Sequence, residues 1–205
     1  MKRVLILLVL SLLFAACGGS KKVAQTRTSP TLTTSASGAT TAQSSPDVLQ
    51  GEANAAATGD IPDNQVYVVF SDTQAGYSIK YPEGWAQQGT GNRVTFRDKN
   101  NIVRVIVGAA AIPTNASVRA DVGRLNGVQV RTAPHATTIA GKPAFKVVYS
   151  TESAPNSVTG KRLRLVVDRY YLWHAGRRAV VDLGTPEGVD NVDAYRLMIE
   201  SFRWS

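Results

Sequence analysis

The fold of this chain is decided by residues 76–85, which read Gly-Tyr-Ser-Ile-Lys-Tyr-Pro-Glu-Gly-Trp. From Tyr77 to Tyr81 large apolar side chains alternate with polar ones, and this period of two predicts a strand with one buried face. Pro82 ends the strand because it has no N–H to donate, and Gly84 favours a turn. Trp85 follows at once, and we expect it to pack in the core; the alternative is a partly exposed platform for a ligand.

This stretch resembles the opening of the PsbP-like domain, a fold shared by the photosystem protein PsbP, the nuclear import factor Mog1 and several bacterial lipoproteins. Two further phrases carry the resemblance: Ser-Phe-Arg-Trp at 201–204, similar to the end of the last helix in many of these domains, and Gly-Lys-Pro at 141–143, similar to a recurring turn. The resemblance covers about residues 66–205. It implies an α+β fold and an accessory binding or assembly role. It extends neither to the photosystem role nor to a family metal site.

The start of the chain is typical of a bacterial lipoprotein. A positively charged N-terminus precedes an apolar run at 4–14, which is too short to span a membrane comfortably and predicts a signal peptide over residues 1–16. Two alanines stand directly before Cys17, a pattern similar to the lipobox. We expect cleavage before Cys17 and acylation, with palmitate among the acyl chains, to anchor the protein at the extracytoplasmic face of the bacterial cell membrane. Plain secretion with an unmodified cysteine is the alternative.

Residues 17–63 consist mainly of Ser, Thr, Ala, Gly and Gln after the cysteine. This segment holds too little apolar surface to offset the entropy lost on folding, so we predict a disordered tether. A flexible chain of this length spans roughly 35–40 Å. We place the folded domain at residues 64–205.

The positive charge of the protein belongs to this domain. The whole chain has a formal net charge of +8, and residues 64–205 contain 18 basic against 11 acidic residues. Such a charge favours the membrane surface, an anionic envelope polymer or an acidic partner complex. It gives little support for nucleic-acid binding, because exposed aromatic side chains are not interleaved with the basic ones. The single cysteine leaves the domain without a disulfide framework or a cysteine metal site.

Hydrophobic periodicity predicts an α+β domain with a central antiparallel β-sheet of about six or seven strands and two packed helices, as in the PsbP/Mog1-like domains. The first four strands follow one another through short loops, and we expect them to form one antiparallel run. The expected strands are 66–71, 77–81, 93–97, 102–109, 137–140, 144–151, 161–173 and 178–183. The expected helices are 117–127 and a last helix that begins at residue 190 or 191 and continues to about 202.

Three groups of residues are candidates for a site. Basic residues crowd on the hairpin predicted around 174–177, and the candidate docking patch consists of Lys161, Arg162, Arg164, Arg177 and Arg178. The candidate aromatic residues of a ligand pocket are Tyr77, Trp85 and Trp173. Asp168 and Asp182 lie on adjacent predicted strands, where a facing pair of carboxylates suits acid–base work or cation binding, although nearby arginines favour an ion-pair cluster.

We find no motif typical of a catalytic, metal or cofactor site, and we expect a non-catalytic accessory module that binds an envelope complex or polymer. The alternative is a carrier or enzyme for a small ligand or lipid, held in a pocket between sheet and helix. One observation separates the two hypotheses. An open pocket lined by the candidate aromatic residues favours the carrier, whereas a filled core favours the binding module.

Overall fold

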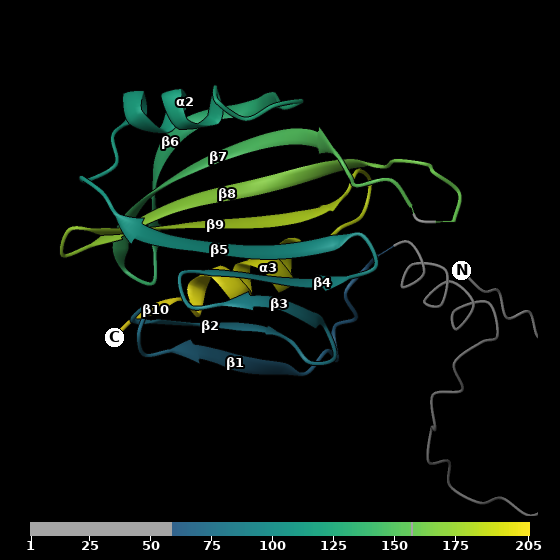
Figure 1. Cartoon of the computed structure of the whole chain (residues 1–205), viewed down its shortest axis with the longest axis horizontal. Coiled ribbons are helices and arrows are strands. Elements are labelled where there is room, and N and C mark those ends of the chain that lie inside the picture. Colours follow the sequence, from purple (N-terminus) through teal and green to yellow (C-terminus); the bar gives the residue numbers. More distant parts are fainter. Residues whose placement is uncertain (1–58, 157) are drawn as a thin grey trace, which may run out of the picture. The chain divides into compact units, whose positions relative to one another are not determined.

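Two antiparallel sheets and two helices make up the part of the chain that the computed structural model describes, residues 59–156 and 158–205 (Figure 1). The expectations for the signal peptide, for Cys17 and for most of the tether lie outside these residues. The described chain is packed from its start: Ile61 is 8% exposed, and its N–H donates to the side-chain oxygen of Asn191 at 2.8 Å. Residues 59–63, which the sequence analysis assigns to the end of the tether, are thus part of the folded domain.

The large sheet has seven strands in the order β3-β4-β5-β9-β8-β7-β6, and every neighbouring pair is antiparallel. The small sheet has three strands in the order β1-β2-β10. The large sheet contains β3 (Ala86–Thr90), β4 (Arg93–Asp98), β5 (Asn101–Ala109), β6 (Gln129–Ile139), β7 (Lys142–Glu152), β8 (Arg164–His174) and β9 (Arg177–Pro186). The small sheet contains β1 (Tyr67–Asp72), β2 (Tyr77–Pro82) and β10 (Arg203–Trp204). The helices are α2 (Asn115–Val122) and α3 (Val192–Glu200).

The two faces of the large sheet are covered by different elements. On one face, buried side chains such as Val181 and Leu183 of β9 form the main core with the small sheet and α3. On the other face a smaller apolar cluster lies under α2, where Val118 and Val122 pack with Tyr171. The large sheet is therefore a middle layer, with α3 and α2 on opposite sides of it (Figure 1).

The opening stretch adopts the structure that its pattern predicts. Tyr77 and Ile79 are fully buried on the inner face of β2. Gly84 has a φ of 84°, a conformation that favours glycine, and Trp85 is 8% exposed within the main core. The prediction that Trp85 is a core residue is confirmed.

The first and last phrases of the domain pack on each other. The ring of Tyr77 stacks on that of Phe202, with 5.7 Å between centroids. The hydroxyl of Ser201 accepts the backbone N–H of Lys80 at 2.8 Å, and β10 pairs with β2 through Arg203 and Trp204. The first and last of the three phrases that carry the family resemblance thus form one structural unit, although they lie at opposite ends of the domain.

The α+β class is confirmed, but the expected run of four neighbouring strands is wrong. β1 and β2 pair with each other and with β10, and they belong to a different sheet from β4 and β5. The sequence does not predict β3, because all five of its residues are exposed and no apolar alternation marks it. β6 begins at Gln129, well before the expected residue 137, and its register shifts twice along β7.

Burial of tyrosine side chains makes the stability of the domain sensitive to alkaline pH. Burial, with the charge of Asp182, raises the pKa of Tyr149 to about 12. Burial also raises the pKa of Tyr77, Tyr171 and Tyr195. In an unfolded chain a tyrosine loses its proton near pH 10, so above that pH the unfolded chain holds fewer protons than the folded one. Stability is therefore fully present below about pH 10 and falls as the pH rises.

We expect the free energy of unfolding to decrease steadily from about pH 10 upward, because several phenols must stay neutral in the folded state. Denaturant titrations at a series of alkaline pH values measure this decrease. Ultraviolet absorbance of the phenolate form provides a second measurement, in which most tyrosines ionise late and together with unfolding. A complete tyrosine titration near pH 10 in a folded protein would contradict the prediction.

Candidate functional site

The side of the large sheet that carries α2 is only partly covered. A helix with its side chains is about 10 Å wide and strands are about 4.8 Å apart, so one helix is too narrow to cover all the strands of this sheet. The buried residues of α2 pack with Val147 of β7, Tyr171 of β8 and Val180 of β9. Among the described residues, no helix lies over β3, β4 and β5 on this side.

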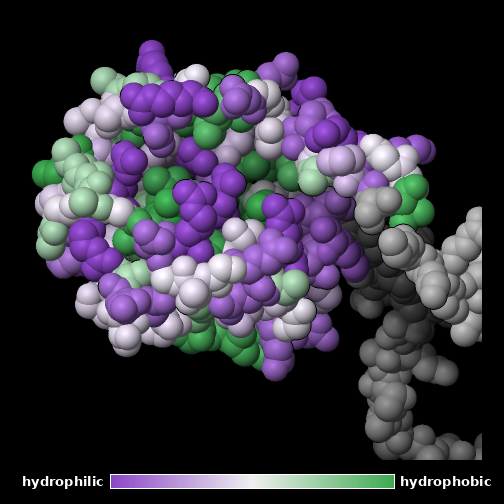
Figure 2. All heavy atoms as spheres, in the orientation of Figure 1, coloured by the Kyte–Doolittle hydropathy of each residue, from purple (hydrophilic) through white to green (hydrophobic). Residues whose placement is uncertain are grey.

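We call the uncovered part of this side the open sheet face. The strand registers place its side chains in cross-strand rows, because partners in an antiparallel ladder point the same way. In Figure 2 hydrophilic side chains gather below α2, over the middle of the view. The open sheet face consists of Gln88, Arg93, Thr95, Arg97, Ile102, Arg104, Ile106 and Arg178, all of them exposed or half-buried.

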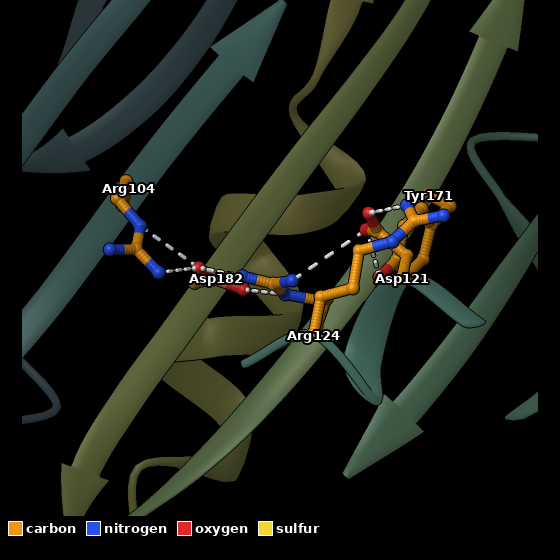
Figure 3. Close-up of polar contacts among 6 residues, drawn as sticks. Arg104, Asp121, Arg124, Tyr171 and Asp182 are labelled. Carbon is orange, nitrogen blue, oxygen red and sulfur yellow. Dashed lines mark hydrogen bonds and ion pairs between the residues drawn. The ribbon is translucent and has the colours of Figure 1, made fainter. Parts of the chain in front are cut away.

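A buried carboxylate between two guanidinium groups lies at the inner edge of this face (Figure 3). Asp182 has a side chain that is 3% exposed and stands opposite Arg104 on β5 and Arg169 on β8. Arg169 donates through Nε to Oδ1 at 2.6 Å and through Nη2 to Oδ2 at 3.0 Å. Arg104 donates to Oδ2 through Nε at 2.9 Å and through Nη2 at 2.5 Å. Both oxygens of Asp182 are thus held by arginine.

The same network reaches helix α2. Oδ2 of Asp121 on α2 accepts the hydroxyl of Tyr171 at 2.8 Å and lies 3.8 Å from Nη1 of Arg169. Arg124, just beyond the helix, lies 4.0 Å from the other oxygen of Asp121. The network therefore connects α2 with β8, β9 and β5, and it runs along the boundary between the covered and the open parts of the sheet (Figure 3).

The carboxylate of Asp182 holds Arg169 in its ionised form. Burial lowers the pKa of Arg169, but the hydrogen bonds and charge of Asp182 outweigh burial, so this pKa lies above its ordinary value. The guanidinium also lies over the ring of Tyr149, at 5.5 Å from its centroid. Since the oxygens of Asp182 accept four N–H groups, this carboxylate serves to position arginines rather than to accept a proton from a substrate.

Asp168 and Asp182 do not form the facing pair that the sequence suggests. Asp182 stands opposite Arg169, whereas Asp168 stands opposite Leu183 and points to the other side of the sheet. There it pairs with Lys146 at 2.6 Å. The alternative, neutralisation of each carboxylate by a basic residue, is the one observed, although Asp182 is buried and not at the surface.

The candidate docking patch is divided between the two ends of β8. Lys161, Arg162 and Arg164 lie at or before its first residue, whereas Arg177 and Arg178 begin β9 beyond its last residue. The ends of this strand are about 33 Å apart, from ten steps of about 3.3 Å. These five residues are therefore not one patch, and only Arg178 belongs to the open sheet face.

The three aromatic residues proposed for a ligand pocket also do not come together in one site. Tyr77 is fully buried and Trp85 is 8% exposed, and both fill the main core. Trp173 is half-buried and lines a pocket of about 420 Å³ at the end of the large sheet. The residues that the sequence analysis missed are Arg93, Arg97 and Arg104. The sequence does contain a pattern that could have identified them. Each alternates with buried residues of β4 or β5 and therefore has to point away from the main core.

Within residues 59–156 and 158–205, no group of three or more His, Cys, Asp or Glu side chains is placed to hold a metal ion. No helix in this part of the chain is long and apolar enough to cross a membrane.

No family model and no curated protein matches the sequence. Among solved structures, the chain is similar to the PsbP protein of the cyanobacterium Synechocystis, with 18% identity, a TM-score of 0.45, and coverage of 72% of this chain and 98% of that one. It is similar to the Ran-binding protein Mog1p of Saccharomyces cerevisiae, with 8% identity, a TM-score of 0.43, and coverage of 69% and 96%.

A third similar structure is LpqN of Mycobacterium tuberculosis, described as involved in cell envelope biogenesis, with 15% identity, a TM-score of 0.36, and coverage of 68% and 84%. The similar structures thus include a PsbP and a Mog1, the two proteins named in the resemblance of residues 76–85 and 201–204.

We expect Asp182→Asn to lower the free energy of unfolding by about 3 kcal/mol, because Arg169 then keeps a buried charge with only Asp121 to balance it. Denaturant unfolding measures the change. Asp168→Asn is the matched control, since its pair with Lys146 is partly exposed at 26% on each side chain and contributes about 1 kcal/mol or less. Equal losses of stability in the two variants would show that the buried ion pairs of Asp182 stabilise the domain no more than the partly exposed pair of Asp168.

Proposed function

We propose that this protein is a membrane-anchored, extracytoplasmic binding module that docks an acidic partner protein of the cell envelope on its open sheet face. The observation that carries the proposal is the unbalanced charge of this face. Arg93, Arg97 and Arg178 form no ion pair with any residue in the described part of the chain. Arg104 shares its single carboxylate with Arg169, so the face as a whole is positive.

The apolar residues between these arginines favour a protein partner. Ile102 and Ile106 are half-buried, and each stands directly opposite an arginine of β4, with Arg104 between them on β5. Protein interfaces combine an apolar centre with a polar rim and are enriched in arginine. An anionic polymer is bound through its charges and leaves two half-exposed isoleucines without a role. Arginine also suits carboxylates geometrically, because its planar group donates two parallel hydrogen bonds.

The face suits binding more than chemistry. Its side chains project from strands, which hold them in fixed rows, and Asp182 holds Arg104 in place from below. A preorganised surface loses less entropy on association than a mobile loop does. Positive charge also steers an acidic partner toward the face and raises the association rate.

The membrane anchor is the second part of the proposal, and it rests on the sequence around Cys17. A lipidated cysteine followed by a tether of roughly 35–40 Å holds the domain near the membrane while leaving it able to turn toward a partner. The positive charge of the domain agrees with a position beside anionic envelope components.

We expect Cys17→Ser to move the protein from the membrane fraction to the soluble extracytoplasmic fraction, because two or three acyl chains hold an anchored protein stably and an unmodified one has no such anchor. Cell fractionation with metabolic labelling by a palmitate analogue measures both the location and the acylation. A Cys17→Ser variant that stays with the membranes would contradict the proposed anchor, and it would leave the proposed role of the open sheet face unaffected.

A photo-crosslinking amino acid in place of the exposed Gln88 tests whether the open sheet face binds a partner in the native envelope. We expect it to trap an acidic protein, and we expect the double variant Arg93→Glu with Arg97→Glu to lower the yield about tenfold or more, because two attractive charges become repulsive. The matched control is Lys161→Glu with Arg162→Glu, which makes the same charge change at the far end of β8. Crosslinking that survives the first variant, or fails equally in the control, would overturn the proposal.

A further inference from the structure

A pocket of about 420 Å³ lies at the end of the large sheet, away from the open sheet face. Its walls come from three segments that are far apart in the sequence: the β6–β7 turn, the last residues of β8, and β10. In Figure 1 the two turns and the C-terminus lie at the same end of the molecule. The floor is formed by the buried side chains of Ile139, Leu172 and Phe202, which belong to the main core.

Two tight turns lie at this end of the sheet. Ala140 and Gly141 have φ angles of 47° and 75°, and Ala175 and Gly176 have φ angles of 45° and 77°. Pairs of residues with positive φ make two-residue hairpin turns, which end both hairpins abruptly. The first turn is fixed in place, because the N–H of Ala140 donates to a carboxylate oxygen of Glu200 at 2.6 Å. Ala140 lines the pocket, and its small side chain leaves the space above the floor unfilled.

Trp204 forms one side of the pocket and is held in place, whereas the ring of Trp173 points to the α2 side of the large sheet, because Trp173 stands opposite Arg178 and alternates with the core residue Leu172. The indole N–H of Trp173 donates to the carbonyl of Ala110 at 3.2 Å. Trp204 packs edge-on against Phe202 at 5.2 Å between centroids, and the guanidinium of Arg177 lies 5.3 Å from the centre of the Trp204 ring. Because the ring of Trp204 is fixed by the protein, a ligand does not have to order it.

The side chains at the mouth of the pocket are basic. Lys142 and Arg203 line it and are exposed, together with His174. Arg203 donates to the backbone carbonyls of Glu200 and Phe202, and neither of these contacts neutralises its charge. Lys142 forms no ion pair in the part of the chain described by the structure. No aspartate or glutamate lines the pocket among these residues.

We propose that this pocket binds a small organic anion that carries a flat aromatic ring. The ring packs against Trp204 on the apolar floor, where aromatic pairs add to the hydrophobic contribution of burial. The anionic group lies at the mouth, within reach of Lys142 and Arg203. A cationic aromatic ligand fits the walls equally well but is repelled by the mouth, so charge decides the specificity.

The pocket and the open sheet face are independent sites. The floor of the pocket belongs to the core on the α3 side of the large sheet, whereas the open sheet face lies on the α2 side. Loss of one function therefore leaves the other intact, and the two proposals fail separately.

Isothermal titration of the purified full-length protein tests the pocket with two probes of equal ring size, 2-naphthalenesulfonate and 2-naphthylmethylammonium. We expect the sulfonate to bind and the ammonium to bind at least about tenfold more weakly. Lys142→Glu lowers sulfonate affinity about threefold to tenfold, since one exposed contact is lost and a repulsion added. Trp204→Leu, with its fold checked by denaturant unfolding, lowers the affinity for the ring about twofold to tenfold.

Lys161→Glu is the control, because it makes the same charge change outside the pocket, and it leaves binding of the sulfonate within about twofold of the unmodified protein. Equal affinity for the two probes, or an equal effect of the Lys142 and Lys161 variants, overturns the proposal. Absence of sulfonate binding at millimolar concentration overturns it as well. Reversal of charge at Arg93 and Arg97 leaves sulfonate binding unchanged, which separates this test from the test of the open sheet face.

Discussion

The contact between Asp182 and its two arginines sets the arrangement of the whole α2 side of the large sheet. The carboxylate is buried in the middle of β9, where an unpaired charge is not tolerated, so the neighbouring strands have to supply cations at the matching register. Arg169 satisfies it from β8 and is linked through Asp121 to α2. Arg104 satisfies it from β5, and its side chain remains 35% exposed.

This asymmetry explains why the sheet has a covered and an open part. On the β8 side, Tyr171 and Val147 offer apolar surface, and α2 buries it. On the β5 and β4 side, arginines alternate with Ile102 and Ile106, and a helix packed there would bury several guanidinium groups without counter-charges. A partner that brings its own carboxylates removes this obstacle, so the same chemistry that excludes an internal helix suits an external acidic surface.

The local patterns of the sequence predict much of this fold, but the site depends on register between distant strands. The alternation in residues 77–81, the turn at Gly84 and the buried place of Trp85 follow from neighbouring residues alone, whereas β3 carries no such pattern. Arg104 and Asp182 are 78 positions apart, and no local feature of either strand shows that they meet. The basic residues near the turn at 174–177 also do not form one patch, because β8 is eleven residues long and holds its two ends apart. The pocket at Trp173 depends in addition on β10, a strand of only two residues.

The pairing of β10 with β2 has a consequence for the order of folding. Ser78 and Arg203 are ladder partners from opposite ends of the domain, so the small sheet cannot be completed until nearly the whole domain is available. Contacts this distant in sequence slow folding, because the loop between them must be closed before the contact is made. β2 therefore keeps one edge unpaired until β10 has been synthesised, and the domain reaches its final structure only after that.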